Sequence, residues 1–121
     1  MISDPVEVMG AAGRRLAQSG VEWDAIKVGR FHALQALERI TNPGAVAVDP
    51  ARPEPVLYFF VQLGGAVGWN IPGSTALGLT AYVVRPPDDK EAPPGPYWLI
   101  SPAHGLTQAA VLRQALEQVA V

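Results

Sequence analysis

The feature that most constrains this fold is a nearly continuous apolar run at residues 56–62, in which Tyr58, Phe59 and Phe60 follow one another. A strand with one solvated face alternates between apolar and polar residues, whereas a strand covered on both faces does not. Prolines precede this run and glycines follow it, which favours a bounded strand. We therefore expect residues 56–62 to form the central strand of a sheet that is covered on both faces.

Shorter strands are predicted around this run. Alternating or β-branched segments place them at residues 21–28, 45–48, 75–78, 81–85 and 97–100. Clusters of Pro, Gly, Asn and Asp mark the connections, which include a turn at residues 42–44, a glycine-rich turn at residues 63–68 and a proline-rich, charged loop at residues 86–96. Several strands in such close succession favour antiparallel pairing.

Helices are predicted at residues 5–19, at residues 30–40 and from about Thr107 onward, with Thr107 as the N-cap of the last helix. Asp4 is the expected cap of the first helix, Pro5 its first residue, and Gly20 the residue that ends it. The residues expected to point inward are Phe31, Leu34, Leu37 and Ile40 in the second helix and Leu112, Ala115, Leu116 and Val119 in the third. The chain is thus predicted to form one α+β domain over residues 1–121, with a mostly antiparallel sheet and helices packed on one face.

Composition removes several classes of function. The chain has 121 residues and no cysteine, which excludes disulfides, zinc–thiolate sites and thiol nucleophiles. A multi-histidine metal site is not expected, because His32 and His104 are the only two histidines. A formal net charge of −2 is unfavourable for binding nucleic acid through its phosphates. The sequence shows neither a signal peptide nor an apolar run near the roughly 20 residues that span a bilayer, so we expect a cytoplasmic protein without membrane contact.

Five segments between Gly44 and Leu99 resemble one known family in their order and spacing. They are residues 45–48, Leu57-Tyr58-Phe59, Pro72-Gly73, Tyr82-Val83-Val84-Arg85-Pro86-Pro87 and Gly95-Pro96-Tyr97-Trp98. Together they are similar to the second half of the bifunctional primase–polymerase domain of the archaeo-eukaryotic primase superfamily. Residues 23–27 also resemble a Trp-Asp-Ala-hydrophobic-basic segment that a group of small bacterial proteins shares.

The residues that the chemistry of the primase–polymerase family requires are missing from the matching positions. Val56 stands where that family has a nucleotide-contacting histidine, and Thr75 stands where it has an acidic residue. The family's Asp-x-Asp pair has no upstream counterpart. Valine cannot hydrogen-bond a phosphate, and a threonine hydroxyl alone cannot hold magnesium as a carboxylate does. The resemblance therefore implies a degenerate core that has lost the polymerase chemistry.

Two groups of side chains are candidate binding sites. Asp24, Lys27 and Arg30 could hold an anion at a strand-to-helix junction, or they could be a solvated loop beside a buried Trp23. A groove rich in arginine and aromatic rings, the residue types favoured at interfaces, could be lined by Trp69, Arg85, Tyr97 and Trp98. The alternative for the second group is that its tryptophans belong to the core.

Three further features each have a functional and a structural interpretation. His104 could act as an acid or base or bind phosphate, but without a partner carboxylate it is predicted to be a surface histidine. A phosphate-binding loop would lead directly into a long helix. Trp69 and Pro72 follow residues 63–68 instead, so these residues are predicted to be a flexible turn. The loop at residues 86–96 could be a partner-binding arm or a mobile connector.

The sequence thus predicts a non-catalytic binding or regulatory protein that acts through protein–protein contacts or self-association. No catalytic residue, metal or cofactor is predicted. Nucleotide or single-stranded nucleic-acid binding without catalysis is the alternative, because bases stack on aromatic rings without sequence preference. The residues predicted to bind a ligand or partner are Trp69, Arg85, Trp98, Tyr97, Lys27 and Arg30.

Overall fold

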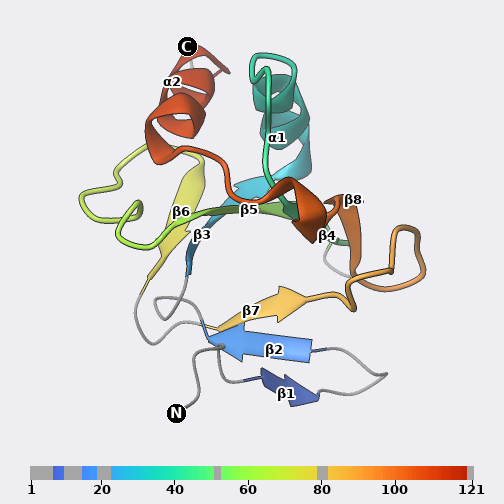
Figure 1. Cartoon of the computed structure of the whole chain (residues 1–121). Coiled ribbons are helices and arrows are strands. Elements are labelled where there is room, and N and C mark those ends of the chain that lie inside the picture. Colours follow the sequence, from blue (N-terminus) through green and yellow to red (C-terminus); the bar gives the residue numbers. More distant parts are fainter. Residues whose placement is uncertain (1–6, 10–14, 19–22, 51–52, 79–81, 120–121) are drawn as a thin grey trace.

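The computed structural model describes residues 7–9, 15–18, 23–50, 53–78 and 82–119. The elements in chain order are β1 (Glu7–Met9), β2 (Arg15–Gln18), β3 (Trp23–Gly29), α1 (Arg30–Leu37), β4 (Val46–Asp49), β5 (Val56–Gln62), β6 (Ser74–Leu77), β7 (Tyr82–Arg85), β8 (Tyr97–Ile100), a 3₁₀ turn (Pro102–His104) and α2 (Ala109–Val119). Figure 1 shows α1 and α2 side by side over one face of a five-stranded sheet, with a three-stranded sheet on the other side.

The apolar run forms the centre of the larger sheet, as the sequence predicted. The strand order is β6-β3-β5-β4-β8, and every neighbouring pair is antiparallel. All residues of β5 except Gln62 are buried. The predicted α+β fold, with an antiparallel sheet and helices on one face, is confirmed for α1, α2 and this sheet.

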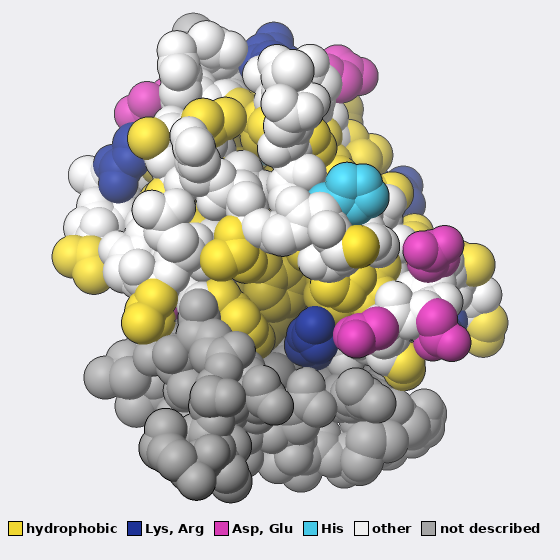
Figure 2. Space-filling view, viewed as in Figure 1, with side chains coloured by type: hydrophobic (Ala, Val, Ile, Leu, Met, Phe, Trp, Pro, Cys, Tyr) yellow, Lys and Arg dark blue, Asp and Glu magenta, His cyan; other side chains and the backbone are white. Residues whose placement is uncertain are grey.

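Each face of the larger sheet packs its own apolar cluster. Side chains from alternate positions form a helix-side cluster that includes Ile26, Leu57 and Phe59. The opposite positions form a second cluster, which includes Trp23, Phe60, Trp98 and Val83 from β7. Burying one such large side chain contributes about 1.5–3 kcal/mol, so the two layers together hold the sheet. On the side away from the helices, Figure 2 shows a hollow lined by hydrophobic side chains.

The predicted helix at residues 5–19 is wrong where the structure describes it. β1 and β2 are antiparallel strands, and β2 pairs with β7 along its whole length, from Arg15 opposite Arg85 to Gln18 opposite Tyr82. That pairing is non-local, whereas the helix was predicted from local signals although Gly10 and Gly13 lie inside its range. Glycine in a helix interior costs about 1 kcal/mol relative to alanine, so the helical alternative is weak. The predicted start of this helix, at Asp4 and Pro5, and its predicted end at Gly20 lie outside the described residues.

Helix α1 is found where it was predicted, but a different side of it faces inward. Phe31 and Leu34 are 69% and 41% exposed, so the prediction that they point inward is wrong. Ala33 and Ala36 are fully buried instead, and Ile40 after the helix is buried as predicted. Small side chains allow α1 to approach the sheet and α2 closely, which leaves the large side chains outside.

The last helix begins two residues later than predicted, and Thr107 does not cap it. Thr107 is buried, and its Oγ1 accepts a hydrogen bond of 2.9 Å from the backbone N–H of Gly44. Its own N–H donates to the carbonyl of Phe60 at 2.9 Å, at the end of β5. Thr107 therefore attaches the chain to the sheet before α2 starts. The predicted burial of Leu112, Ala115 and Leu116 is confirmed, whereas Val119 is only half-buried.

Within the described part of the chain, neither helix has the length and apolar character needed to cross a membrane.

Candidate functional site

The candidate site is built around β8, at one edge of the five-stranded sheet. β8 pairs with β4 so that Trp98 lies opposite Ala47 and Ile100 lies opposite Val46, which leaves Leu99 as an extra residue. Such a bulge redirects a side chain relative to regular strand alternation. Leu99 is 43% exposed, whereas Trp98 is 2% exposed. The bulge thus presents one large aliphatic side chain outside the sheet.

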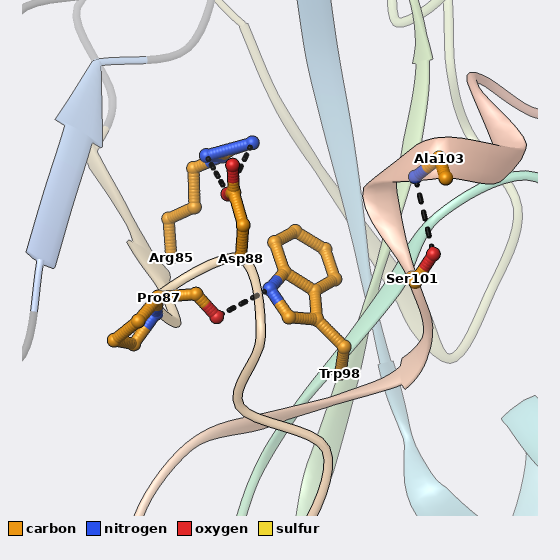
Figure 3. Close-up of polar contacts among 6 residues, drawn as sticks. All are labelled: Arg85, Pro87, Asp88, Trp98, Ser101 and Ala103. Atoms are coloured by element: carbon orange, nitrogen blue, oxygen red, sulfur yellow. Dashed lines mark hydrogen bonds and ion pairs between the residues drawn. The ribbon is translucent and has the colours of Figure 1, made fainter.

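Trp98 fastens the loop of residues 86–96 to this edge. Its indole Nε1 donates to the carbonyl of Pro87 at 3.0 Å (Figure 3), and its backbone N–H donates to the carbonyl of Lys90 at 2.8 Å. The guanidinium carbon of Arg85 lies 5.3 Å from the centre of the indole, and Arg85 also pairs with Asp88 at 3.4 Å. The loop is therefore held against β8 by backbone and side-chain contacts.

An open groove of about 750 Å³ runs beside β8. It is lined by the whole of β8, by the turn at residues 41–43, and by Glu91, Ser101 and His104. Ser101 Oγ accepts a hydrogen bond of 3.1 Å from the N–H of Ala103 (Figure 3) and lies 3.5 Å from Nδ1 of His104. The lining of the groove thus combines apolar side chains with hydrogen-bonding groups and one carboxylate, that of Glu91. No family model, curated protein or solved structure matches this chain.

The structure brings together two of the six residues predicted to bind a partner, because Arg85 stacks on Trp98. Tyr97 precedes Trp98 on β8 and lines the groove, but its side chain lies on the other face of the sheet. Tyr97 packs on the helix-side core, and Trp98 packs on the opposite side. Because Trp98 is buried, its ring serves as a core residue, and the exposed contact surface is formed by its neighbours.

Lys27 lies on the same face of the sheet as Trp98 but far from it. It is opposite Tyr58 on β5 and Thr75 on β6, and it is half-buried. Three strand spacings, or roughly 14 Å, separate β3 from β8. Within the described residues, no hydrogen bond or ion pair engages the Lys27 ammonium.

Trp69 does not share a groove with Trp98, so the predicted four-residue surface is wrong. Trp69 packs against the helix-side core, and the sheet separates it from the cluster that contains Trp98. Its Nε1 donates to Ser74 Oγ at 2.8 Å, and the guanidinium carbon of Arg113 lies 5.2 Å from its ring centre. Trp69 therefore joins the turn before β6 to α2.

The predicted cluster of Asp24, Lys27 and Arg30 does not form either. Asp24 is buried, and its Oδ2 accepts hydrogen bonds of 3.0 Å from the N–H groups of both Gly64 and Ala66. Lys27 points to the opposite face of β3, because the two positions differ by an odd number of residues. Arg30 is exposed at the start of α1. Of the alternative interpretation, the burial of Trp23 is confirmed, but the solvated loop is wrong because Asp24 and Lys27 lie on strand β3 and Asp24 is buried.

Asp24 makes the glycine-rich turn at residues 63–68 an anchored structure. Two of its glycines, Gly64 and Gly68, adopt positive φ angles of 88° and 73°, a region that favours glycine. Leu63 and Val67 project from this turn and are 55% and 80% exposed. The signal for the anchor was in the sequence, since a buried acid on a strand needs donors and a glycine-rich turn has free N–H groups.

The groove itself was missed from the sequence. Its walls come from residues 41–43, from the 86–96 loop and from β8, which no local pattern brings together. The sequence predicts Leu99 as an ordinary residue of the strand at 97–100, and no local signal indicates the bulge that turns it out. His104 is exposed, as predicted for a surface histidine. Across the described part of the chain, no three His, Cys, Asp or Glu side chains are grouped closely enough to hold a metal ion.

Proposed function

We propose that this chain is a non-catalytic protein-binding module, built on a degenerate primase–polymerase-like core, which binds a protein segment in the groove beside β8. The observation that carries the proposal is the exposed Leu99 side chain, held outside the sheet by a bulge and set in a groove of about 750 Å³. An apolar anchor surrounded by polar groups is the usual anatomy of a protein interface.

Contact through side chains fits this edge better than addition of a strand. A partner strand would need outward backbone groups of β8, and the N–H of Trp98 already donates to the carbonyl of Lys90. A bulge and a covering loop are common devices that protect sheet edges from strand pairing. The partner therefore contacts the groove through an inserted side chain that packs on Leu99 and Ile100.

The surroundings of the two polymerase positions support a role without catalysis. Val56 is buried in β5, opposite Gly29 and Asp49. Thr75, which stands where the resembled family has an acidic residue, lies on β6 opposite Lys27. Neither side chain supplies the carboxylate or imidazole that the resembled family uses.

The experiment is a pull-down from native lysate with tagged protein, read by mass spectrometry against an untagged control. Leu99→Asp should abolish capture of the specific partner, because it places a charge on the apolar floor of the groove. Leu63→Asp is the matched control, since Leu63 is also an exposed leucine but lies in the glycine-rich turn. Capture that is equal for all three proteins would contradict the proposal. Co-purification of nucleotide or nucleic acid in place of protein would favour the alternative function.

A further inference from the structure

We propose that the partner segment in the β8 groove carries a lysine or arginine next to an aliphatic residue, and that this cation pairs with Glu91. The inference rests on the proposed function and specifies the chemistry of the ligand. Leu99 and Ile100 would receive the aliphatic side chain, while Glu91 at the rim of the same groove would receive the positive charge.

The loop of residues 86–96 is rich in charged residues. Some of them have a partner within the loop, and others do not. The ammonium of Lys90 donates to the carbonyls of Ala92 and Pro94, so that positive charge is used inside the loop. The guanidinium of Arg85 pairs with Asp88 and stacks on Trp98. Arg85 and Lys90 therefore both help to hold the loop together.

Two acidic groups of the same loop remain without such partners. Asp89 and Glu91 are exposed, and no hydrogen bond or ion pair engages either carboxylate within the described part of the chain. Figure 2 shows acidic side chains gathered over the loop between β7 and β8. An unpaired carboxylate and an exposed leucine in the lining of one groove complement a segment that is both aliphatic and basic, and they disfavour an acidic one.

Few other side chains that line the groove can carry a charge. Its other lining side chains that ionise are Tyr97 and His104, and the remaining residues are neutral. Glu91 is thus the main source of charge selectivity. Because the pair would be exposed, its contribution is modest and sensitive to salt.

The test is selection of peptides from a displayed random-peptide library on the purified full chain. Recovered peptides are then synthesised with a fluorescent label, and their affinity is measured by anisotropy for the wild type and for Glu91→Gln, Glu117→Gln and Leu99→Ala. Glu117 on α2 is an exposed carboxylate outside the groove, so its variant is the control. The peptides should contain Lys or Arg beside an aliphatic residue. Glu91→Gln should weaken binding roughly two- to five-fold, whereas Glu117→Gln should not.

The outcomes separate this inference from the function on which it rests. Peptides that lose affinity with Leu99→Ala but bind Glu91→Gln like the wild type would overturn the basic-ligand inference and retain the groove. Peptides unaffected by Leu99→Ala, or no recovered peptide at all, would overturn both. Addition of salt to about 1 M, where the Debye length is about 3 Å, should weaken wild-type binding and leave Glu91→Gln binding nearly unchanged.

Discussion

Replacement of Thr107 by aspartate distinguishes a helix cap from a buried anchor. If Thr107 capped α2, aspartate would be tolerated, since Asp and Thr are both good caps. In the structure, however, Thr107 is 1% exposed, and both its N–H and its Oγ1 are engaged with distant backbone groups of Phe60 and Gly44. A carboxylate there would be buried without a cation, which costs at least about 3 kcal/mol. With a slope of about 2 kcal/mol/M in urea, the unfolding midpoint should fall by about 1.5 M.

The matched control is Gln108→Asp, one residue further along the chain. Gln108 is exposed, and its carbonyl accepts the N–H of Leu112 at 3.0 Å, as the residue preceding a helix does. Aspartate at this position should stabilise the fold by about 0.5–1 kcal/mol. Urea unfolding followed by tryptophan fluorescence measures both variants. A wild-type or higher midpoint for Thr107→Asp would refute the buried-anchor assignment.

Other substitutions test the remaining contacts. Gly44→Ala should lower the free energy of unfolding in urea by about 1–3 kcal/mol, because a Cβ would lie 2.6 Å from the carbonyl oxygen of Gly105; an unchanged free energy of unfolding would contradict this close approach. Asp24→Ala should speed hydrogen exchange at the Gly64 amide, with a stability loss of about 1–3 kcal/mol, and unaltered exchange would argue against the anchor. Arg85→Ala should lower the free energy of unfolding in urea by at least about 0.5–1 kcal/mol, because it removes the stacking on the indole and the pair with Asp88, and an unchanged free energy would contradict these contacts.

The sequence predicted the elements whose signals are local. The run at β5 lacks alternation because it is covered on both faces, and its residues alone report this. The strands from β3 to β8 are short segments between turn residues, and most of their bounds agree with the structure to within two residues. In α2, the spacing of Leu112, Ala115 and Leu116 identified the buried stripe correctly.

The wrong predictions share a cause. In each of them, contacts with residues distant in the sequence determine the local structure. Residues 15–18 are a strand because β7 provides a partner, and that partner lies far along the chain. Thr107 has the residue type of a cap, yet the backbone of Gly44 claims its hydroxyl. On α1, the choice between Phe31 and Ala33 as the inward side depended on how closely the helix approaches its neighbours.

The candidate site illustrates the same limit. Arg85 and Trp98 were expected to lie together and do, because β7 leads into the loop that returns to β8. Trp69 was assigned to the same surface on residue type alone, and the sheet separates the two tryptophans. Leu99 depends on a bulge, a feature of strand pairing that no single strand encodes.

The most direct test of the proposed groove is site-specific photo-crosslinking. A photoreactive phenylalanine analogue is incorporated at Leu99 in one sample and at Leu63 in another, and adducts are identified by mass spectrometry after irradiation in the native lysate. If the groove binds a protein segment, the analogue at position 99 gives a discrete protein adduct, and excess chain without the analogue reduces the yield of that adduct. The analogue at position 63 gives no such adduct. Equal adducts from both positions, or adducts with nucleic acid alone, would contradict the assignment of the β8 groove as the protein-binding site.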